Sequence, residues 1–345
     1  MFAKAWMPCR MVELKNLRER WVRTILILMC FWMVAGRIHG ADPAQALVPT
    51  EHNPLYLQFL RPSWYAVSDA QDSTFNLGAS GFYANMFERR SNDRFFQDFD
   101  NEMASGEIYA HYRISPRLSL KAHMGFHRFS GGFLDRAIQN FHDTFGLPND
   151  DRDEVANQRF ALTLIDQFTG TLFTADEHHW YNGSPQIGAS WTLVSRAGWD
   201  WAAGATLKLP LGGGPFVNSR LDAGVGLHGR KAGNRWRFDF QAGVLSLQAE
   251  QPLATITRDA AAYGMAWIER RWWRHTRTFL QIDGATSYFH GTGLNSLDPP
   301  TVNLYFGVAQ PLGERWSLVT AFGEDLIARG PSLDFSLTLG IQVDL

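Results

Sequence analysis

From Thr74 to the C-terminus, apolar and polar residues alternate in segments of about ten residues that are separated by short polar interruptions. Successive side chains of a β-strand point to opposite faces, so each segment has one face toward an apolar medium and one toward a polar medium. The last segment, residues 335–345, alternates without a fault. Similar segments cover residues 118–127, 199–209, 236–243, 279–288 and 302–308. The chain is therefore predicted to be all-β.

Segment length distinguishes a membrane barrel from a soluble β-sandwich, which also alternates. A tilted strand needs about 9–11 residues to cross a bilayer, whereas strands of soluble sheets usually have about 5–6. The polar face carries Lys, Arg, His, Asp and Gly, which is typical of a wet barrel interior, and aromatic residues gather at segment ends as membrane girdles do. These aromatic residues are Trp191, Trp199, Trp236, Trp272, Trp273, Tyr288 and Trp316. We expect a transmembrane antiparallel β-barrel over residues 74–345.

The connections between segments alternate between short and long, as the periplasmic turns and extracellular loops of such barrels do. Thirteen segments are clear, but the number must be even if both ends of the barrel chain lie on the same side of the membrane. Reading the alternation inward from both ends places the discrepancy between Gln158 and Ser184. Splitting that stretch into strands at residues 158–166 and 168–175 predicts fourteen strands, with twelve as the alternative.

The N-terminus has the features of a cleaved secretory signal peptide. An apolar run at residues 25–36 follows an arginine-rich stretch and is about half the length that a membrane-spanning helix needs. The small residue Gly40 favours cleavage directly after it, so residues 1–40 would form the leader. Residues 41–73, which include an apolar patch at 54–65, would form a periplasmic lead-in or an N-terminal plug. The expected location is the outer membrane of a Gram-negative cell.

Cysteine use and charge narrow the possible partners. Both cysteines, Cys9 and Cys30, lie in the leader, which predicts a mature chain without disulfides or thiol chemistry. The leader holds 7 of the 32 Lys+Arg and 2 of the 34 Asp+Glu, so 25 basic and 32 acidic residues remain, a net charge of −7. Nucleic acid is not an expected partner, because no net basic field exists to hold phosphates. We expect outer-membrane lipid, periplasmic chaperones, the barrel-assembly machinery and a small solute instead.

One stretch, residues 131–148, breaks the period of two and predicts a helix. Apolar residues recur there at the spacing of one helical face, and Gly146 and Pro148 would end the helix. The face consists of Leu134, Ile138, Phe141 and Phe145. The helix belongs either to a long extracellular loop or to the lumen. It would act as a gate or plug in or over the lumen, or only stiffen the barrel rim.

Other candidate sites are weaker. Asp135 and His142 lie seven residues apart on one helical face and could exchange protons, but no nucleophile stands at a defined spacing, so no catalytic residue is assigned. Residues 176–179 (Asp-Glu-His-His) resemble a metal patch, yet neighbours on a strand point to opposite sides, so no metal or other cofactor is expected. Glu324 and Asp325 end the penultimate segment, either as lumen-edge charges that set a cation preference or as a solvated strand end.

The terminal segment carries a second signal. Gly340, Val343 and Leu345 are spaced as in the C-terminal signal that the barrel-assembly machinery recognises. The final residue of that signal is usually aromatic, whereas this chain has Leu345. We expect weaker recognition rather than none.

Several of these features together resemble the proteobacterial family catalogued as domain of unknown function 3187, whose members look like outer-membrane barrels. The matching residues are 53–55 near the expected mature start, the helix motif at 131–148, and Glu-Asp-Leu at 324–326 followed by residues 331–335. The resemblance implies that the helix and the Glu-Asp-Leu turn are family features. It brings no activity with it.

Taken together, these patterns favour an outer-membrane channel or transporter for a small solute, and a hydrophobic compound is one version of this hypothesis. A barrel of twelve to fourteen strands has an interior wider than wall side chains alone fill. The alternatives are a non-conducting structural or assembly barrel and, with less support, an outer-membrane hydrolase. The sequence does not predict an enzyme.

Overall fold

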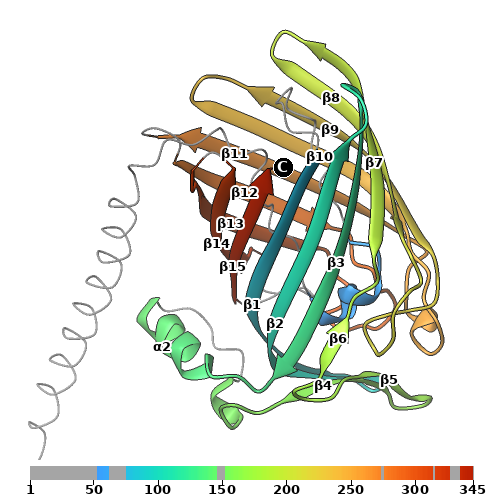
Figure 1. The fold of residues 1–345 in the computed structure, drawn as a ribbon. Coiled ribbons are helices and arrows are strands. Elements are labelled where there is room, and N and C mark those ends of the chain that lie inside the picture. The colour runs from blue at the N-terminus through green and yellow to red at the C-terminus, as the bar shows by residue number, and fades with distance from the viewer. Residues whose placement is uncertain are drawn as a thin grey trace, which may run out of the picture.

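A computed structural model describes residues 53–61, 75–145, 152–272, 276–313, 315–326 and 335–344. In these residues twelve strands form a closed antiparallel barrel (Figure 1). They are β1 (Phe75–Ser91), β2 (Phe95–Arg113), β3 (Leu118–Ser130), β7 (Gln186–Arg196), β8 (Trp199–Lys208), β9 (Asp222–Ala232), β10 (Trp236–Ser246), β11 (Ala260–Arg271), β12 (Arg277–Ala285), β13 (Thr301–Pro311), β14 (Trp316–Asp325) and β15 (Phe335–Asp344). Pairing of β1 with β15, from Asn76 opposite Asp344 to Asn85 opposite Phe335, closes the barrel.

Twelve, the alternative number, is correct, and fourteen is wrong. The stretch that we split forms β4 (Ala161–Asp166) and β5 (Gly170–Thr174), and β6 (Trp180–Asn182) follows. β4 pairs with the end of β2, β5 pairs only with β4, and β6 pairs with the end of β3, so all three lie beyond the closed wall. They alternate like barrel strands because Leu162 and Leu164 of β4 are buried, but they are too short to cross a bilayer.

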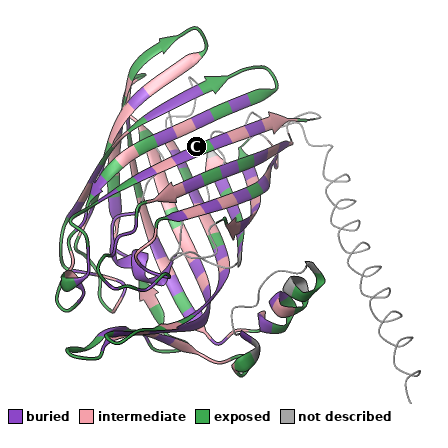
Figure 2. Ribbon diagram, turned by 180° about the vertical axis from the view of Figure 1, so that it is seen from behind, coloured by how far each residue is buried: buried purple, intermediate pink, exposed green. Residues whose placement is uncertain are grey.

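Figure 2 shows the alternation of the sequence as bands of buried, intermediate and exposed residues along the strands. Large apolar side chains more than half exposed point outward from strands all round the barrel, and their sequence neighbours point inward and are largely buried. The outward residues include Ile108, Val225, Leu227, Val244, Phe306, Leu337 and Leu339. Such a belt is unfavourable in water, at about 25 cal/mol per Å² of apolar surface, and suits contact with lipid chains.

The two ends of the barrel differ. Short turns join the strands at the end where β1 begins and β15 ends, which we call the turn end; long connections lie at the opposite, loop end (Figure 1). The β1–β2 hairpin projects past its neighbour there, because β1 pairs with β15 only as far as Asn85 but continues with β2 to Ser91. Within the described residues, no helix combines the length and apolarity needed to span a membrane.

Four helical elements complete the described fold. The 3₁₀ helix η2 (Pro54–Gln58) precedes β1, and the helix α2 (Asp135–Phe145) and η3 (Arg152–Glu154) follow β3. A further 3₁₀ turn, η4 (Leu253–Thr255), lies between β10 and β11. Asn53 begins η2, since its side-chain oxygen accepts a hydrogen bond from the Leu55 N–H, and Pro54 supplies the φ angle of a first helical residue.

Candidate functional site

Residues 53–61, which we call the lumen segment, lie inside the barrel near its loop end (Figure 1). At one side Arg61 forms an ion pair with Glu107 of β2 at 2.5 Å. At the other side the Leu60 N–H donates to the Asp222 carboxylate of β9 at 2.8 Å. The five apolar side chains of the segment are at most 4% exposed. Each such burial contributes about 1.5–3 kcal/mol, so the segment packs as part of the core.

Three residues at the ends of β8 and β9 and in the loop between them hold the backbone of this segment. Lys208 and Asn218 both donate to the Gln58 carbonyl, at 2.8 and 3.0 Å, while Asp222 accepts from Leu60 as above. Lys208 and Asp222 also form an ion pair at 2.9 Å, and neither side chain is exposed. Each charge thus has an opposite charge and hydrogen-bond partners, which a buried ion pair requires to be tolerated.

An aromatic pair in the loop after β12 faces the same segment. The Tyr56 ring stacks on Tyr288 with 4.1 Å between ring centres and 12° between planes. Phe59 packs edge-on against Tyr288 and Phe289, with ring centres 5.7 and 6.0 Å apart. The expected place of Tyr288 in an outer girdle is therefore wrong: the residue follows β12, but its ring turns into the lumen, where it is 1% exposed.

Apolar residues fill the loop-end half of the lumen around the segment. The strands contribute Phe82, Met86, Phe99, Met103, Phe129, Leu245 and Tyr263, and the loops contribute Phe216, Leu253, Ile256, Phe289, Leu294 and Leu297. All belong to one buried cluster with the lumen segment. The interior at this end is thus a packed core rather than a wet channel.

The turn-end half of the lumen has a polar network on one side of the wall. Asp239 of β10 accepts from Arg230 at 2.7 Å, from Arg237 at 2.6 Å, and lies 3.1 Å from His228. Glu269 of β11 extends the network, because its carboxylate lies 3.2 Å from a guanidinium nitrogen of Arg277 on β12. All of these side chains point inward and are buried.

The helix α2 lies outside the wall, beside the β1–β2 hairpin (Figures 1 and 2). Strand alternation confirms this side: Glu102, which binds the chain leading into α2, shares its face of β2 with Ile108 and Tyr112, exposed 51% and 47%. Asn85, opposite Glu102 on β1, is only 1% exposed although it also faces outward. The described residues that follow β3, which we call the covering segment, therefore cover this part of the outer wall. The helix lies in this loop and not in the lumen.

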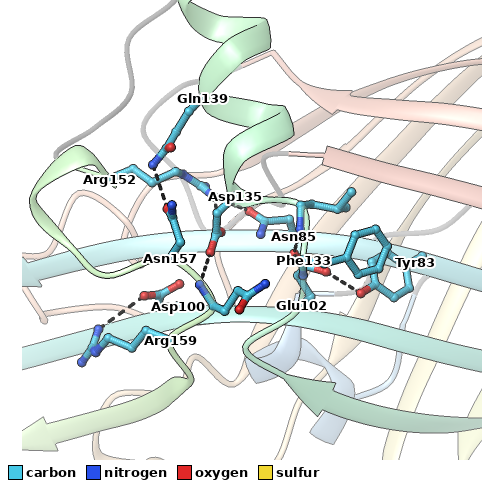
Figure 3. A network of polar contacts seen from close by, with 12 residues as sticks. Tyr83, Asn85, Asp100, Glu102, Phe133, Asp135, Gln139, Arg152, Asn157 and Arg159 are labelled. Carbon is cyan, nitrogen blue, oxygen red and sulfur yellow. Dashed lines mark hydrogen bonds and ion pairs between the residues drawn. The ribbon is translucent and has the colours of Figure 1, made fainter.

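Glu102 is the main attachment point of that covering segment (Figure 3). Its carboxylate accepts hydrogen bonds from the N–H groups of Phe133, at 2.8 Å, and Leu134, and from the Tyr83 hydroxyl. The Phe133 ring also contacts the Tyr83 ring, 5.7 Å away. A carboxylate on the outer wall thus satisfies the backbone just before α2, where no intrahelical partner exists.

Asp135, at the first position of α2, makes a second attachment. It is buried, 3.3 Å from Arg152, and accepts from the Gln158 N–H at 2.6 Å. The same guanidinium nitrogen of Arg152 donates to Asn85 at 2.8 Å. Asp135 therefore holds the returning chain against α2.

A third contact carries a titratable group. Arg159 binds Asp98 through both guanidinium nitrogens and lies 3.5 Å from Asp100. Both carboxylates belong to the part of β2 that pairs with β4, beyond the membrane-spanning wall. Burial, and after it the nearby Asp135 carboxylate, raise the pKa of Asp100 to about 6 against the opposing charges of Arg159 and Arg152.

This pKa predicts that the covering segment is held more firmly in acid. Folded Asp100 binds its proton more tightly than the unfolded chain does, so stability increases as pH falls from 6 toward 4 and is lost as pH rises through 6. Hydrogen exchange of residues 131–160 should be slower at pH 5 than at pH 7.5, after correction for intrinsic rates. Asp100→Asn should abolish the difference. Faster exchange at pH 5 in the unmodified protein would contradict the assignment.

The structure places the remaining sequence candidates as follows. Ile138 is buried and Leu134 half-buried beside α2, while the side chains of Phe141, His142 and Phe145, and residues Gly146 and Pro148, lie outside the described part. Asp325 shares the lumen face of β14 with Val319 and Ala321, whereas Glu324 faces outward. Their role in ion preference stays a prediction.

Two further sets of candidates stay untested. Gly340 lies opposite Ser80 and Val319, and Val343 opposite Leu77 and Trp316, which fixes their register but tests no assembly signal. Leu345 lies outside the described residues. At residues 176–179, Glu177 accepts a hydrogen bond from the Gly131 N–H and His178 lies 3.4 Å from it on the surface.

Comparisons with known proteins agree with this architecture. The chain is similar to the COG4313 outer membrane channel from Pseudomonas putida F1, with 12% identity and a TM-score of 0.52 over 79% of this chain and 96% of that one. It is more distantly similar to the NanC porin (8% identity, TM-score 0.47, 78% and 100% covered) and the KdgM porin (9%, 0.41, 77% and 99%). The first likeness shows that the fold is that of an outer-membrane β-barrel.

The sequence itself gives the family. No protein among those with curated functions matches it. A family model described as protein of unknown function (DUF3187) matches residues 24–344, nearly the whole chain. The resemblance noted in the helix and Glu-Asp-Leu motifs is thus confirmed, and the chain belongs to the DUF3187 family of outer-membrane barrels.

Proposed function

We propose that the protein is an outer-membrane channel for a small solute and that the lumen segment, residues 53–61, is its N-terminal plug. The observation that carries the proposal is that a separate piece of chain packs inside the strands and loops and completes the core at the loop end. A twelve-stranded wall encloses more space than its own side chains fill. Filling that space with a chain end, rather than with larger wall residues, leaves the interior able to open.

The proposal places the protein after export. The leader, residues 1–40, would be removed, chaperones would carry the chain, and the assembly machinery would recognise its C-terminal strand, including Gly340, Val343 and Leu345. The turn end would then face the periplasm and the loop end the outside. The outward apolar belt supports insertion of the barrel in a bilayer.

A full-length variant tests the proposal. Leu55→Asp combined with Leu60→Asp puts two carboxylates into an apolar core, which costs several kcal/mol each and should expel the plug. In planar bilayers the unmodified protein should stay mostly closed, and this released variant should show a steady open conductance at least tenfold larger. Leu211→Asp with Leu221→Asp, two exposed loop positions, is the matched control and should stay closed.

The same measurement distinguishes the alternative of a non-conducting structural barrel. If the released variant is folded, as judged by heat-modifiable migration in gels and by its β-type circular dichroism, and still passes no ions, the channel proposal fails. The protein would then be a non-conducting structural barrel.

A further inference from the structure

We propose that the strand ends and loops that contact the plug form the solute-binding site of the channel, and that the solute is a small uncharged aromatic amide whose place the plug occupies. This inference rests on the proposed function. The plug presents an aromatic ring, a carbonyl and an N–H to the wall, through Tyr56, Gln58 and Leu60. Tyr288 stacks on the ring, Lys208 donates to the carbonyl and Asp222 accepts from the N–H.

The polarity of this site is unusual for its surroundings. Lys208 and Asp222 are fully buried and Asn218 is 2% exposed, beside the apolar cluster that fills the loop end. Apolar residues would close the barrel as well, because a buried ion pair adds little stability over well-packed apolar side chains. A role in recognition accounts for polar groups at this place.

Strand ends and loops of the barrel order these groups without help from the plug. Lys208 is bound by Asp222 at 2.9 Å and by the Asn218 side-chain oxygen at 2.7 Å. The Gln248 N–H donates to Asp222 and the Gln248 carbonyl accepts from Asn218, at 2.8 and 3.0 Å. Two donors, on Lys208 and Asn218, and one acceptor, on Asp222, are thereby aimed at the lumen. In this structure the plug backbone uses all three.

Hydrogen bonds within the loops also hold the backbone of the two aromatic residues, Tyr288 and Phe289. The Tyr288 carbonyl accepts from the Arg258 N–H at 2.8 Å, and the Phe289 carbonyl accepts from the Arg258 side chain at 2.9 Å. The Phe289 N–H is bound by the Ser287 hydroxyl at 2.9 Å. These bonds hold the backbone of both residues independently of the plug. The Tyr288 hydroxyl donates to the Leu60 carbonyl of the plug at 3.3 Å, a bond that an amide carbonyl of the solute would replace, and the two rings offer an apolar surface to another ring.

Charge defines the solute class further. Lys208 and Asp222 neutralise each other, so the site favours a solute without net charge. The solute must carry a hydrogen-bond acceptor and a donor on the same face. A peptide-type amide beside an aromatic ring meets these needs. An anion or cation would leave one member of the pair without its balance.

The test uses the full-length released variant, Leu55→Asp with Leu60→Asp, and two probes. One probe is N-acetyl-L-tyrosinamide; the other is a capped synthetic peptide with the sequence of residues 53–61. Isothermal titration calorimetry on detergent-solubilised protein should show saturable binding of both, with N-acetyl-L-alaninamide at least tenfold weaker than the tyrosine compound. A peptide with the Tyr56→Leu change should also bind at least tenfold more weakly, a comparison that leaves the protein unaltered.

A variant of the site and a matched variant of the outer surface complete the test. Tyr288→Leu in the released variant should weaken both probes at least tenfold, while Tyr112→Leu, which removes an aromatic ring from the outward face, should leave binding unchanged. Equal binding of the tyrosine and alanine amides, or no effect of the Tyr56→Leu change, would overturn the inference. Because calorimetry needs no ion flow, binding without conductance would reject the channel and keep the site, and conductance without binding would do the reverse.

Discussion

Asp239→Asn is expected to lower the free energy of unfolding of the barrel by about 3–5 kcal/mol, the cost of removing one partner from a buried charge network. Asp239 is 5% exposed and accepts hydrogen bonds from both Arg230 and Arg237. Asn keeps the shape of the side chain but supplies no charge, so two guanidinium groups of the lumen wall lose their nearest carboxylate. Urea unfolding of lipid-reconstituted protein, followed by tryptophan fluorescence, measures the change.

The control is Asp176→Asn, an exposed position beyond the barrel wall, which should change the free energy of unfolding by less than about 0.5 kcal/mol. A loss of less than 1 kcal/mol for Asp239→Asn would show that the lumen network is hydrated well enough to be dispensable. In that case the turn-end half of the lumen is a water-filled space and not a packed one.

The second large effect concerns the ion pair under the plug. Asp222→Ala removes the acceptor of the Leu60 N–H and leaves Lys208 buried without its counter-charge, for an expected loss of about 3–5 kcal/mol. The double change Lys208→Met with Asp222→Leu removes both charges together. It should be less destabilising than Asp222→Ala alone, because no unpaired charge remains.

The same urea titration measures this series, and hydrogen exchange of residues 53–61 reports whether the plug stays in place. In Asp222→Ala these amides should exchange quickly while the strand amides stay protected. If the double variant proves less stable than the single one, the pair contributes more than its mutual neutralisation, and the argument from desolvation is wrong.

The strands were predictable because a bilayer imposes a strict rule on them. Every second side chain must suit lipid, and no loop can interrupt a spanning strand, so segments such as β15 can be recognised from the sequence alone. The strand number could not be obtained in this way. β4 alternates as regularly as a barrel strand, because Leu162 and Leu164 bury against the same core, and only pairing shows that it lies beyond the wall.

The candidate site was much less predictable. Tyr288 ends an alternating segment just as a girdle residue does, and only the path of the following loop turns it inward. Lys208 and Asp222 are separated by a long loop, so nothing in their spacing indicates an ion pair. The helix motif was visible, but an amphipathic face predicts burial without saying against what.

One signal for the outer position of the helix was present. Asp98, Asp100 and Glu102 lie on the face of β2 that continues toward the turn end with Ala104 and Ile108. A lipid-facing stripe that turns acidic must leave the membrane or be covered there. The acidic residues of β2 therefore indicated where the outer wall is covered, although they precede the helix by more than thirty residues in the sequence.

The same acidic stripe has a consequence for how deep the barrel sits. Outward residues of the β2 wall are apolar or small from Ile114 to Ala104, and with a rise of about 3.3 Å per residue and a tilt of about 40° this stretch is roughly 25 Å tall. That height matches the hydrocarbon layer around such barrels, so Glu102 falls at the level of the lipid headgroups. The acidic stripe therefore limits how deeply the barrel can insert. Moving the barrel further into the membrane would bring the carboxylates of Asp98, Asp100 and Glu102 into the hydrocarbon layer, which is energetically unfavourable.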